Sequence, residues 1–318
     1  MAHLAAHQHG KSRVRVARVW RDGPTHTFVE WSVDTVLESQ MAHAFLEGSN
    51  SDMTATDTQK NTVYYIAKTL RPNAAPEDFA VALARHFVLT YPKVTKAKVT
   101  VSQAPWQRHS QAGQAHDHAF EMLASGTRTA YAEHDDAGIT VVHGGISDWR
   151  VLKTTQSGYE GAPPTTTAQS AARAPFLTHA EPRAGFCKDE YTALKDTRER
   201  MLATSVTATW KYSGQLPCYH KPFEAVRIAM AAAFFGPPHE GVYSPSVQYT
   251  LFEMGKAAVA AVAAVESVKL KMPNIHFLPC SPLNSETFAD DVYVATSEPH
   301  GTIDAIVTRA GAMPHSRL

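Results

Sequence analysis

The sequence Thr56-Asp57-Thr58-Gln59 stands at a predicted helix start and could take part in binding a small anion. The first turn of a helix presents free N–H groups, and these groups attract negative charge. Helix capping explains the same residues: Thr56 can cap the helix, Gln59 can reach back as in a capping box, and Asp57 complements the helix dipole. On these residues alone, capping is the simpler interpretation and anion binding stays open.

A second predicted helix begins in a similar way at Ser244-Pro245, with Val247 and Gln248 in its first turn. Serine before a helix is a common cap, because its hydroxyl accepts a hydrogen bond from a free N–H group. The same N–H groups could also receive an anion. The sequence therefore contains two helix starts of one kind.

Histidine is frequent, with 17 copies, so most of its positions are expected to be structural or exposed. His276 stands at the start of a predicted strand. The pairs His7/His9 and His116/His118 have spacings that can hold a metal, but no cysteine or carboxylate set surrounds either pair. We interpret both pairs as solvated and predict no metal site.

Arg200 lies in a charged run over residues 195–200 and has the appearance of an exposed side chain. Periodicity does not distinguish it from its neighbours. The chain contains no glycine-rich phosphate loop, nucleophile elbow or zinc-protease motif. The residue pattern alone therefore does not specify a reaction.

The composition is that of a globular protein of about two domains. The 318 residues include 30 Lys and Arg against 30 Asp and Glu, and 44% are hydrophobic. A net charge of zero gives no electrostatic footprint for nucleic acid or an anionic membrane. No apolar stretch reaches the 18 or more residues of a membrane-spanning helix. We therefore expect no nucleic-acid partner and no membrane insertion.

The three cysteines, Cys187, Cys218 and Cys280, are widely spaced and form no CxxC pair. An odd number at such spacing argues against a disulfide framework and against structural zinc.

The chain ends in Ser316-Arg317-Leu318, a conservative variant of the Ser-Lys-Leu peroxisomal address. The first ten residues lack the apolar core and cleavage site of a secretory signal. We therefore expect a peroxisomal protein whose C-terminus binds the peroxisomal import receptor.

Hydrophobic periodicity predicts an α+β protein in which one order of elements occurs twice. Period-two alternation predicts strands, and a 3.6-residue period predicts helices. In the first half we expect strands over 12–20, 25–37, 94–101, 119–131 and 139–143, and helices starting at 56 and 76. In the second half we expect strands over 151–157, 203–212, 274–279, 291–296 and 302–309, and helices over 222–235 and 245–269.

The repeated order predicts two domains, residues 1–146 and 147–318, with the break near Gly144 to Asp148. Residues 162–187 are rich in Pro, Thr, Ala and Ser, a composition typical of an inserted surface loop.

Several stretches of the chain together resemble urate oxidase, the uricase family. These stretches are His9-Gly10-Lys11-Ser12-Arg13-Val14-Arg15-Val16, Ala55-Thr56-Asp57-Thr58-Gln59-Lys60-Asn61-Thr62-Val63-Tyr64, Phe87-Val88-Leu89-Thr90-Tyr91-Pro92, Val151-Leu152-Lys153-Thr154-Thr155-Gln156-Ser157-Gly158-Tyr159-Glu160-Gly161, Leu202-Ala203-Thr204-Ser205-Val206-Thr207-Ala208, Gly241-Val242-Tyr243-Ser244-Pro245-Ser246-Val247-Gln248 and Asp290-Asp291-Val292-Tyr293-Val294-Ala295-Thr296-Ser297-Glu298-Pro299-His300-Gly301. The resemblance runs from Gly10 to the C-terminal tripeptide, apart from the inserted loop.

The resemblance implies tandem tunnelling-fold domains, each a four-stranded antiparallel sheet with two helices packed on one face. It also implies a homotetramer whose active sites lie between subunits. Such an enzyme oxidises urate with O2 and water to 5-hydroxyisourate and hydrogen peroxide, and it needs no cofactor. Peroxide production would explain a peroxisomal address, because peroxisomes contain catalase.

The resemblance also assigns substrate contacts. Arg200 and Gln248 match the pair that grips the planar anion, since a guanidinium fork and an amide can each make two in-plane hydrogen bonds. Tyr159 stands where relatives usually have Phe, so the stacking ring is kept and a hydroxyl is added. Val247 and Leu194 match pocket positions.

The proposed chemistry needs proton transfer and a place for O2. Lys11, Thr56 and His276 match the proton-relay residues, and Asn274 matches the side chain that holds O2 and later water, with Thr56 beside it. Thr56 and Asp57 match the edge that a neighbouring subunit supplies. Lys11 would act as a base, a role that burial or a nearby positive charge favours.

Two alternatives remain open beside the oxidase. One is a purine- or pterin-ring enzyme related to GTP cyclohydrolase, which would require a tight Cys/His zinc set. The other is an inactive peroxisomal protein of the same fold that binds urate or a purine without turnover. The loop over 162–187 departs from the family pattern, and we expect it to project from the surface.

Overall fold

The structure is a computed structural model, and it describes residues 2–159, 189–192, 197, 199–280 and 292–311. Within these residues, eight strands form one sheet in the order β1-β2-β3-β6-β7-β8-β9-β10, and each strand runs antiparallel to its neighbours. The strands are β1 (His9–Asp22), β2 (Thr25–Ser39), β3 (Val94–Gln103), β6 (Thr127–Asp135), β7 (Thr140–Lys153), β8 (Leu202–Tyr212), β9 (Val265–Pro279) and β10 (Tyr293–Thr308).

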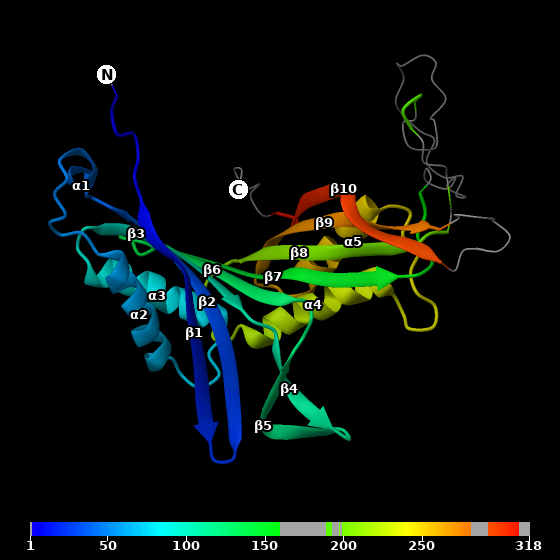
Figure 1. Ribbon diagram of the computed structural model, residues 1–318, viewed down its shortest axis with the longest axis horizontal. Helices are drawn as coiled ribbons and strands as arrows, with labels where there is room; N and C mark the ends of the chain where they lie inside the picture. The colour runs from blue at the N-terminus through cyan, green and yellow to red at the C-terminus, as the bar shows by residue number, and fades with distance from the viewer. Residues whose placement is uncertain (1, 160–188, 193–196, 198, 281–291, 312–318) are drawn as a thin grey trace.

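Four long helices cover one face of this sheet (Figure 1). They are α2 (Thr56–Thr69), α3 (Pro76–Thr90), α4 (His220–Phe235) and α5 (Val247–Ala261), and a short α1 (Ala42–Leu46) precedes them. The first pair packs on β1, β3 and β6, and the second pair packs on β7, β9 and β10. This is the predicted arrangement of four strands and two helices, present twice.

Alternation along the strands places the core between the sheet and the helices. In β2, Val29, Trp31 and Val33 face the helices and are buried, while the residues between them are partly exposed. Helix α3 begins at Pro76, which needs no N–H partner there, and buries Phe79 against Trp31. Burial of such large apolar side chains supplies the main driving force for this packing.

A buried ion pair joins the two helix pairs. Glu77 of α3 accepts a hydrogen bond from Arg128 of β6 at 2.7 Å, and Arg128 also donates to the carbonyl oxygen of Tyr219 at the start of α4. Burial raises the pKa of Glu77 to about 7, while the guanidinium of Arg128 opposes that shift. Removing one partner of such a pair typically costs about 3–5 kcal/mol of stability. These contacts therefore connect α3 of the first half to the start of α4 in the second half.

The predicted break near Gly144 to Asp148 lies inside β7, which continues across it. The strand pairs with β6 on one side and β8 on the other, and its register with β8 shifts between Ile146 and Trp149, where Asp148 has a positive φ of 50°. The division into residues 1–146 and 147–318 stays a prediction, and β7 belongs to the sheets of both halves. The strands expected over 139–143 and 151–157 are one strand here, so that expectation was wrong.

Gly144 has a packing role inside this strand. A Cβ at Gly144 would lie 2.6 Å from Nε1 of Trp210 and 2.9 Å from Oε1 of Glu77. Glycine is therefore needed here for close packing within a continuous strand, at the point where the repeated order of elements predicted a break.

Other boundaries also differ from the prediction. The strands expected over 291–296 and 302–309 are one strand, β10, and the strand expected over 274–279 begins earlier, at Val265. The helix expected over 245–269 ends at Ala261, because Val265 and Val268 pair with β8 instead and a tight turn at Val262 reverses the chain. The strand expected over 119–131 is interrupted at Gly126, which has a φ of +91°. Its first part pairs in a separate hairpin of β4 (Trp106–Gln111) and β5 (Gln114–Met122).

Candidate active site

A cavity of about 520 Å³ opens where β7 and β9 end and β10 begins. This volume falls within the range of small-molecule sites, about 300–1,000 Å³. Three parts of the chain form its wall: the segment after β7, the segment before β8, and the ends of β9 and β10. The lining residues are Thr154, Thr155, Tyr159, Thr197, Glu199, Arg200, Met201, Asn274, Ile275, His276, Phe277, Leu278 and Tyr293.

Four of the predicted site residues, Tyr159, Arg200, Asn274 and His276, meet in this cavity. They come from three segments that are far apart in the sequence. Asn274 and His276 are two residues apart on β9. Asn274 lies opposite Thr204 of β8, and His276 lies opposite Thr296 of β10. The sheet therefore fixes the spacing of these two side chains.

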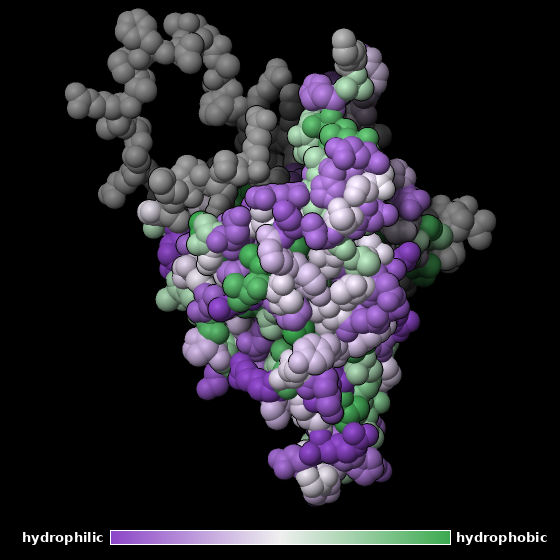
Figure 2. All heavy atoms as spheres, turned by 90° about the vertical axis from the view of Figure 1, so that its left-hand side faces the viewer, coloured by the Kyte–Doolittle hydropathy of each residue, from purple (hydrophilic) through white to green (hydrophobic). Residues whose placement is uncertain are grey.

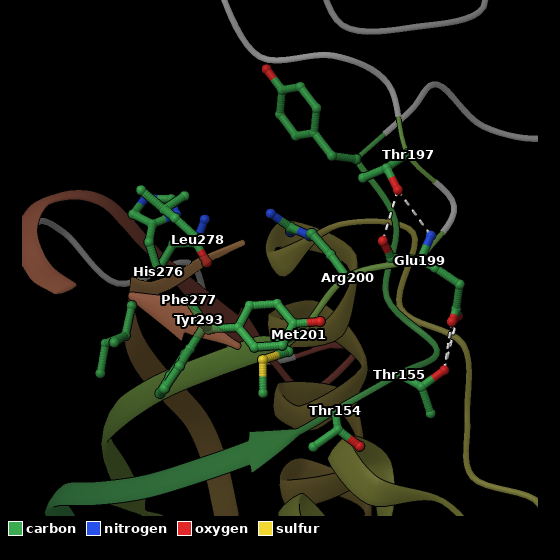
Figure 3. Close-up of a pocket in the computed structure, with 13 residues that line it drawn as sticks. Thr154, Thr155, Thr197, Glu199, Arg200, Met201, His276, Phe277, Leu278 and Tyr293 are labelled. Carbon is green, nitrogen blue, oxygen red and sulfur yellow. Dashed lines mark hydrogen bonds between the residues drawn. The ribbon is translucent and has the colours of Figure 1, made fainter. Parts of the chain in front are cut away.

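Arg200 provides the positive charge of the cavity. Figure 3 shows its side chain extending toward the side that His276 and Leu278 line. Its Nε is buried and has no hydrogen-bond partner among the described residues, and its Cζ lies 5.9 Å from the centre of the Tyr159 ring. Burial lowers the pKa of Arg200, although the group stays charged at neutral pH. A half-buried guanidinium whose Nε has no partner in the described part of the chain is suited to a planar anion.

His276 is placed to accept a proton. Burial is the main cause that lowers its pKa, and the positive charges of Arg200 and His300 lower it further. The imidazole is therefore neutral at pH 7, and one of its ring nitrogens is free to act as a base. Its position beside Arg200 places a proton acceptor next to an anion site.

The start of α5 lies beside the segment that follows β7 and carries Tyr159. Val247 and Gln248 are not among the residues that line the cavity. Val247 is buried and Gln248 is exposed. Gly158 donates its N–H to the carbonyl oxygen of Ser244 at 2.9 Å, which joins the segment before α5 to the one that carries Tyr159.

Ser244 is not the helix cap that the sequence suggested. The cap is Ser246, whose Oγ accepts a hydrogen bond from the N–H of Tyr249 at 3.1 Å. Ser244 is buried, and its Oγ accepts from Nζ of Lys153 and from Oγ1 of Thr250, both at 2.7 Å. Its hydroxyl is thus used to attach the helix to β7.

A second group of predicted residues lies at the start of α2. Thr56 is the first residue of the helix and Ala55 is the N-cap, with no side-chain cap, so the capping box was a wrong prediction. Gln59 is fully buried and accepts a hydrogen bond from Oγ1 of Thr35 at 2.7 Å. Because Gln59 is held in the core, Thr56 and Asp57 are left exposed at the helix start.

Lys11 lies close to this helix start. The register of β1 against β2 shifts between Lys11 and Val14, and bulges of this kind often redirect side chains at functional sites. Asp57 forms an ion pair with Lys60 at 2.5 Å, and Lys60 lowers the pKa of Asp57, with a smaller contribution from Lys11. Lys11, Thr56 and Asp57 therefore form a charged, open edge.

The open edge and the cavity do not meet within one chain. Lys11, Thr56 and Asp57 are absent from the lining of the cavity. The edge lies at β1 and the cavity at β9 and β10, and these strands are at opposite ends of the sheet order. Figure 2 views the molecule from the left of Figure 1, the end where α1 and α2 lie, and shows a surface of interspersed polar and apolar residues.

Some predictions fall outside the described residues. These are Leu194, the loop over 162–187 and the tripeptide Ser316, Arg317 and Leu318. Glu199, Met201 and Tyr293 also line the cavity and were not predicted as site residues. Two of them flank Arg200 in the chain, and the third lies in the stretch 290–301 that carried the family resemblance. Adjacency to assigned residues was the signal that could have found them.

Within the described part of the chain, no group of three or more His, Cys, Asp or Glu residues could hold a metal ion. Cys218 and Cys280 are free thiols, and Cys187 lies outside the described residues. No described helix is long and apolar enough to cross a membrane.

The fold and the cavity together define a class: a duplicated antiparallel α+β protein with a pocket of small-molecule size, lined by Arg200 and His276, at the end of its sheet. A family model described as Uricase matches residues 7–133 and 175–304. The chain belongs to the uricase family.

Curated relatives and solved structures agree with this assignment. The chain is 44% identical to Uricase-2 isozyme 2 of Glycine max and 42% identical to Uricase of Arabidopsis thaliana, over 95% of this chain and 94% of each relative. The crystal structure of uricase from Arthrobacter globiformis matches with a TM-score of 0.82 at 29% identity, covering 99% of this chain and 98% of that one. These findings confirm the predicted family and the tandem tunnelling fold.

Proposed function

We propose that this protein is a urate oxidase. It oxidises urate with O2 and water to 5-hydroxyisourate and hydrogen peroxide. The reaction is balanced: urate gives up two electrons to O2, the oxygen of water enters the ring product, and O2 leaves as peroxide. Membership of the uricase family and near full-length similarity to proteins named Uricase support this activity.

One observation carries the proposal in structural terms. Tyr159, Arg200, Asn274 and His276, assigned by resemblance as urate-site residues, come from three distant segments and line one cavity. Arg200 supplies a cation whose Nε is buried and has no hydrogen-bond partner among the described residues. Such a cavity is suited to a flat anion that has alternating N–H and C=O groups.

The roles of the side chains follow from their chemistry. Arg200 and Gln248 bind the edge of urate, and the ring of Tyr159 stacks on its face. Val247 and Leu194 belong to the pocket. Asn274 holds O2 and then water above the ring, because a side-chain amide can both donate and accept hydrogen bonds.

Proton transfer is assigned to His276 on the cavity side and to Lys11 and Thr56 on the open edge. Neutral His276 can receive a proton, because its pKa is lowered by burial and by Arg200. Lys11 and Thr56 reach the ligand of a neighbouring chain, and Asp57 borders the same ligand. This arrangement requires the homotetramer that the resemblance implies, with each active site built from two subunits.

The location in the cell is part of the same proposal. A peroxide-producing oxidase is suited to an organelle that contains catalase, and Ser316-Arg317-Leu318 resembles the import signal read by the peroxisomal receptor. A fluorescent protein fused before the intact tripeptide should enter peroxisomes, and deletion of Leu318 should leave it in the cytosol. Import that persists after this deletion would contradict the assigned signal.

The activity is tested by following the ultraviolet absorbance of urate in aerated buffer with purified, chelator-treated protein, together with peroxide release. We expect loss of absorbance and one peroxide for each urate. Activity that disappears with chelation and returns with zinc would favour the GTP cyclohydrolase-like alternative. Tight urate binding without turnover would favour the inactive binding protein.

A further inference from the structure

The wall of the cavity is interrupted by a long stretch of sequence. Residues 160–196 separate Tyr159 from Thr197, and Arg200 follows three residues later. Tyr159 and Arg200 both line the cavity, so their relative position depends on what ties the two ends of this stretch together. Joining the ends of a long segment has an entropic cost, and specific contacts must offset it.

Two kinds of contact join the ends. Tyr159 and Thr197 exchange a pair of backbone hydrogen bonds, with N–H to O distances of 2.7 and 3.1 Å between the heavy atoms. The carboxylate of Glu199 accepts hydrogen bonds from Oγ1 of Thr155 at 2.5 and 2.9 Å and from the N–H of Gln156 at 3.1 Å. Hydrogen bonds to an ionised acceptor are stronger than neutral ones. Glu199 therefore joins the segment before β8 to the segment after β7.

The direction of the side chain separates Glu199 from the ligand-binding groups. In Figure 3 its carboxylate reaches Thr155, whereas Arg200 extends away from it toward His276 and Leu278. A carboxylate facing an anionic ligand would repel it. The carboxylate oxygens of Glu199 bind Thr155 and Gln156, so Glu199 holds the wall of the site and does not bind the ligand.

Gln156, which Glu199 binds, also forms hydrogen bonds with the segment that leads into α5. Gln156 accepts a hydrogen bond from the N–H of Ser244 at 2.8 Å and donates from Nε2 to the carbonyl oxygen of Glu240 at 2.7 Å. Ser244 lies four residues before Gln248. By holding Gln156, Glu199 also holds the segment that leads into α5.

We propose that Glu199 is a positioning residue for urate binding: its carboxylate fastens the segments that carry Tyr159, Arg200 and Gln248 into one wall. This inference rests on the proposed urate oxidase activity for its ligand. Glu199 contributes no step of the oxidation, so its removal affects the binding of urate more than the turnover of bound urate.

The test compares Glu199→Ala and Glu199→Gln in the full-length enzyme by steady-state kinetics with urate. Glu199→Ala is expected to raise KM about tenfold and to change kcat less than about threefold, because a few charge-assisted hydrogen bonds are lost. Glu199→Gln keeps an acceptor oxygen and is expected to restore most of the KM. Glu190→Ala removes an exposed acid from the same part of the chain and should leave both constants unchanged.

A second measurement does not need turnover. Hydrogen exchange of the amides of Gln156, Gly158 and Tyr159 should be faster in Glu199→Ala than in the wild type and near wild type in Glu199→Gln. Thr155→Val removes one of the donors and provides a milder variant that should show a smaller increase in KM. Circular dichroism checks that each variant is folded.

The outcomes separate the two proposals. If the wild type oxidises urate and Glu199→Ala has wild-type KM and wild-type amide exchange, the positioning role is wrong and the oxidase activity stands. If the wild type does not oxidise urate, the proposed function is wrong. In that case, unchanged amide exchange and unchanged urate affinity in Glu199→Ala would also overturn the positioning role.

Discussion

The two ends of the sheet carry two very different sets of predicted site residues. At the β9 and β10 end, Arg200 and His276 line a cavity, and burial lowers the pKa of both. At the β1 end, Thr56 and Asp57 are exposed, and the Asp57 carboxylate pairs with Lys60 at the surface. One chain thus places Arg200 and His276 in a cavity and leaves Thr56 and Asp57 on an open edge. This difference is consistent with the proposal that the open edge completes the site of a neighbouring chain.

The largest expected effect is on the open edge. Lys11→Met removes the proposed base and should lower kcat by about 10²–10⁴-fold, the usual contribution of acid–base catalysis, with a much smaller change in KM. Thr56→Ala should act in the same direction. Lys68→Met, near the other end of α2, is the matched control and should keep wild-type kcat. If Lys11→Met raises KM while kcat is unchanged, the edge binds substrate and does not transfer protons.

The next effect is on the enclosed cavity. Arg200→Ala removes charge-assisted hydrogen bonds and should lower kcat/KM by about 10–100-fold, chiefly through KM. Arg200→Lys keeps the charge without the planar fork and should recover only part of this loss. Arg227→Ala, on the exposed face of α4 where Arg227 pairs with Glu224, serves as the control. An unchanged KM in Arg200→Ala would remove this residue from the site.

A smaller effect is expected at the ring of Tyr159. Tyr159→Ala removes the stacking face and should lower kcat/KM by about three- to tenfold, in line with the strength of aromatic contacts. Tyr159→Phe keeps the ring and should stay within about twofold of the wild type. The comparison of these two variants in the urate assay shows whether the ring or the hydroxyl matters. A larger loss in Tyr159→Phe than in Tyr159→Ala would contradict stacking.

The smallest effect is a displacement of the pH profile. His276 accepts a proton only when neutral, so kcat/KM should fall as the pH drops through its pKa, which burial, Arg200 and His300 place below the ordinary value. His300→Ala removes one of these positive charges, which raises the pKa and moves the acidic limb of the profile to higher pH by roughly half a unit or less. A shift to lower pH would contradict this assignment, and His239→Ala, an exposed position, should cause none.

The sequence predicted the architecture better than the site. Alternation in β2 and the helical periods after Thr56 and Pro76 identified the correct elements, because those patterns record which side chains are buried. The repeated order of elements placed a break near Gly144, whereas this glycine lies inside β7 and packs against the distant Trp210 and Glu77. No local pattern reports such a contact.

The site residues show the same limit. Arg200 stands in a charged run and His276 is one of many histidines, so nothing in their own surroundings in the sequence marks them. They become distinctive only when three segments meet around a cavity. The family resemblance supplied them, and the cavity brings four of the assigned residues together. Gln59 of α2 is a further example: its sequence position suggested a role in a helix cap, whereas it accepts a hydrogen bond from Thr35 of β2.

The central claim is that one active site is built from the open edge of one chain and the cavity of another. The most direct measurement mixes Lys11→Met and Arg200→Ala, which are unfolded together and refolded into mixed oligomers. The assay uses urate well below the KM of Arg200→Ala, where each variant alone has little activity. With equal amounts, random pairing leaves both halves intact in about one quarter of the sites, so about one quarter of wild-type activity should return. Mixed oligomers that form but remain as inactive as the separate variants would show that each site belongs to a single chain.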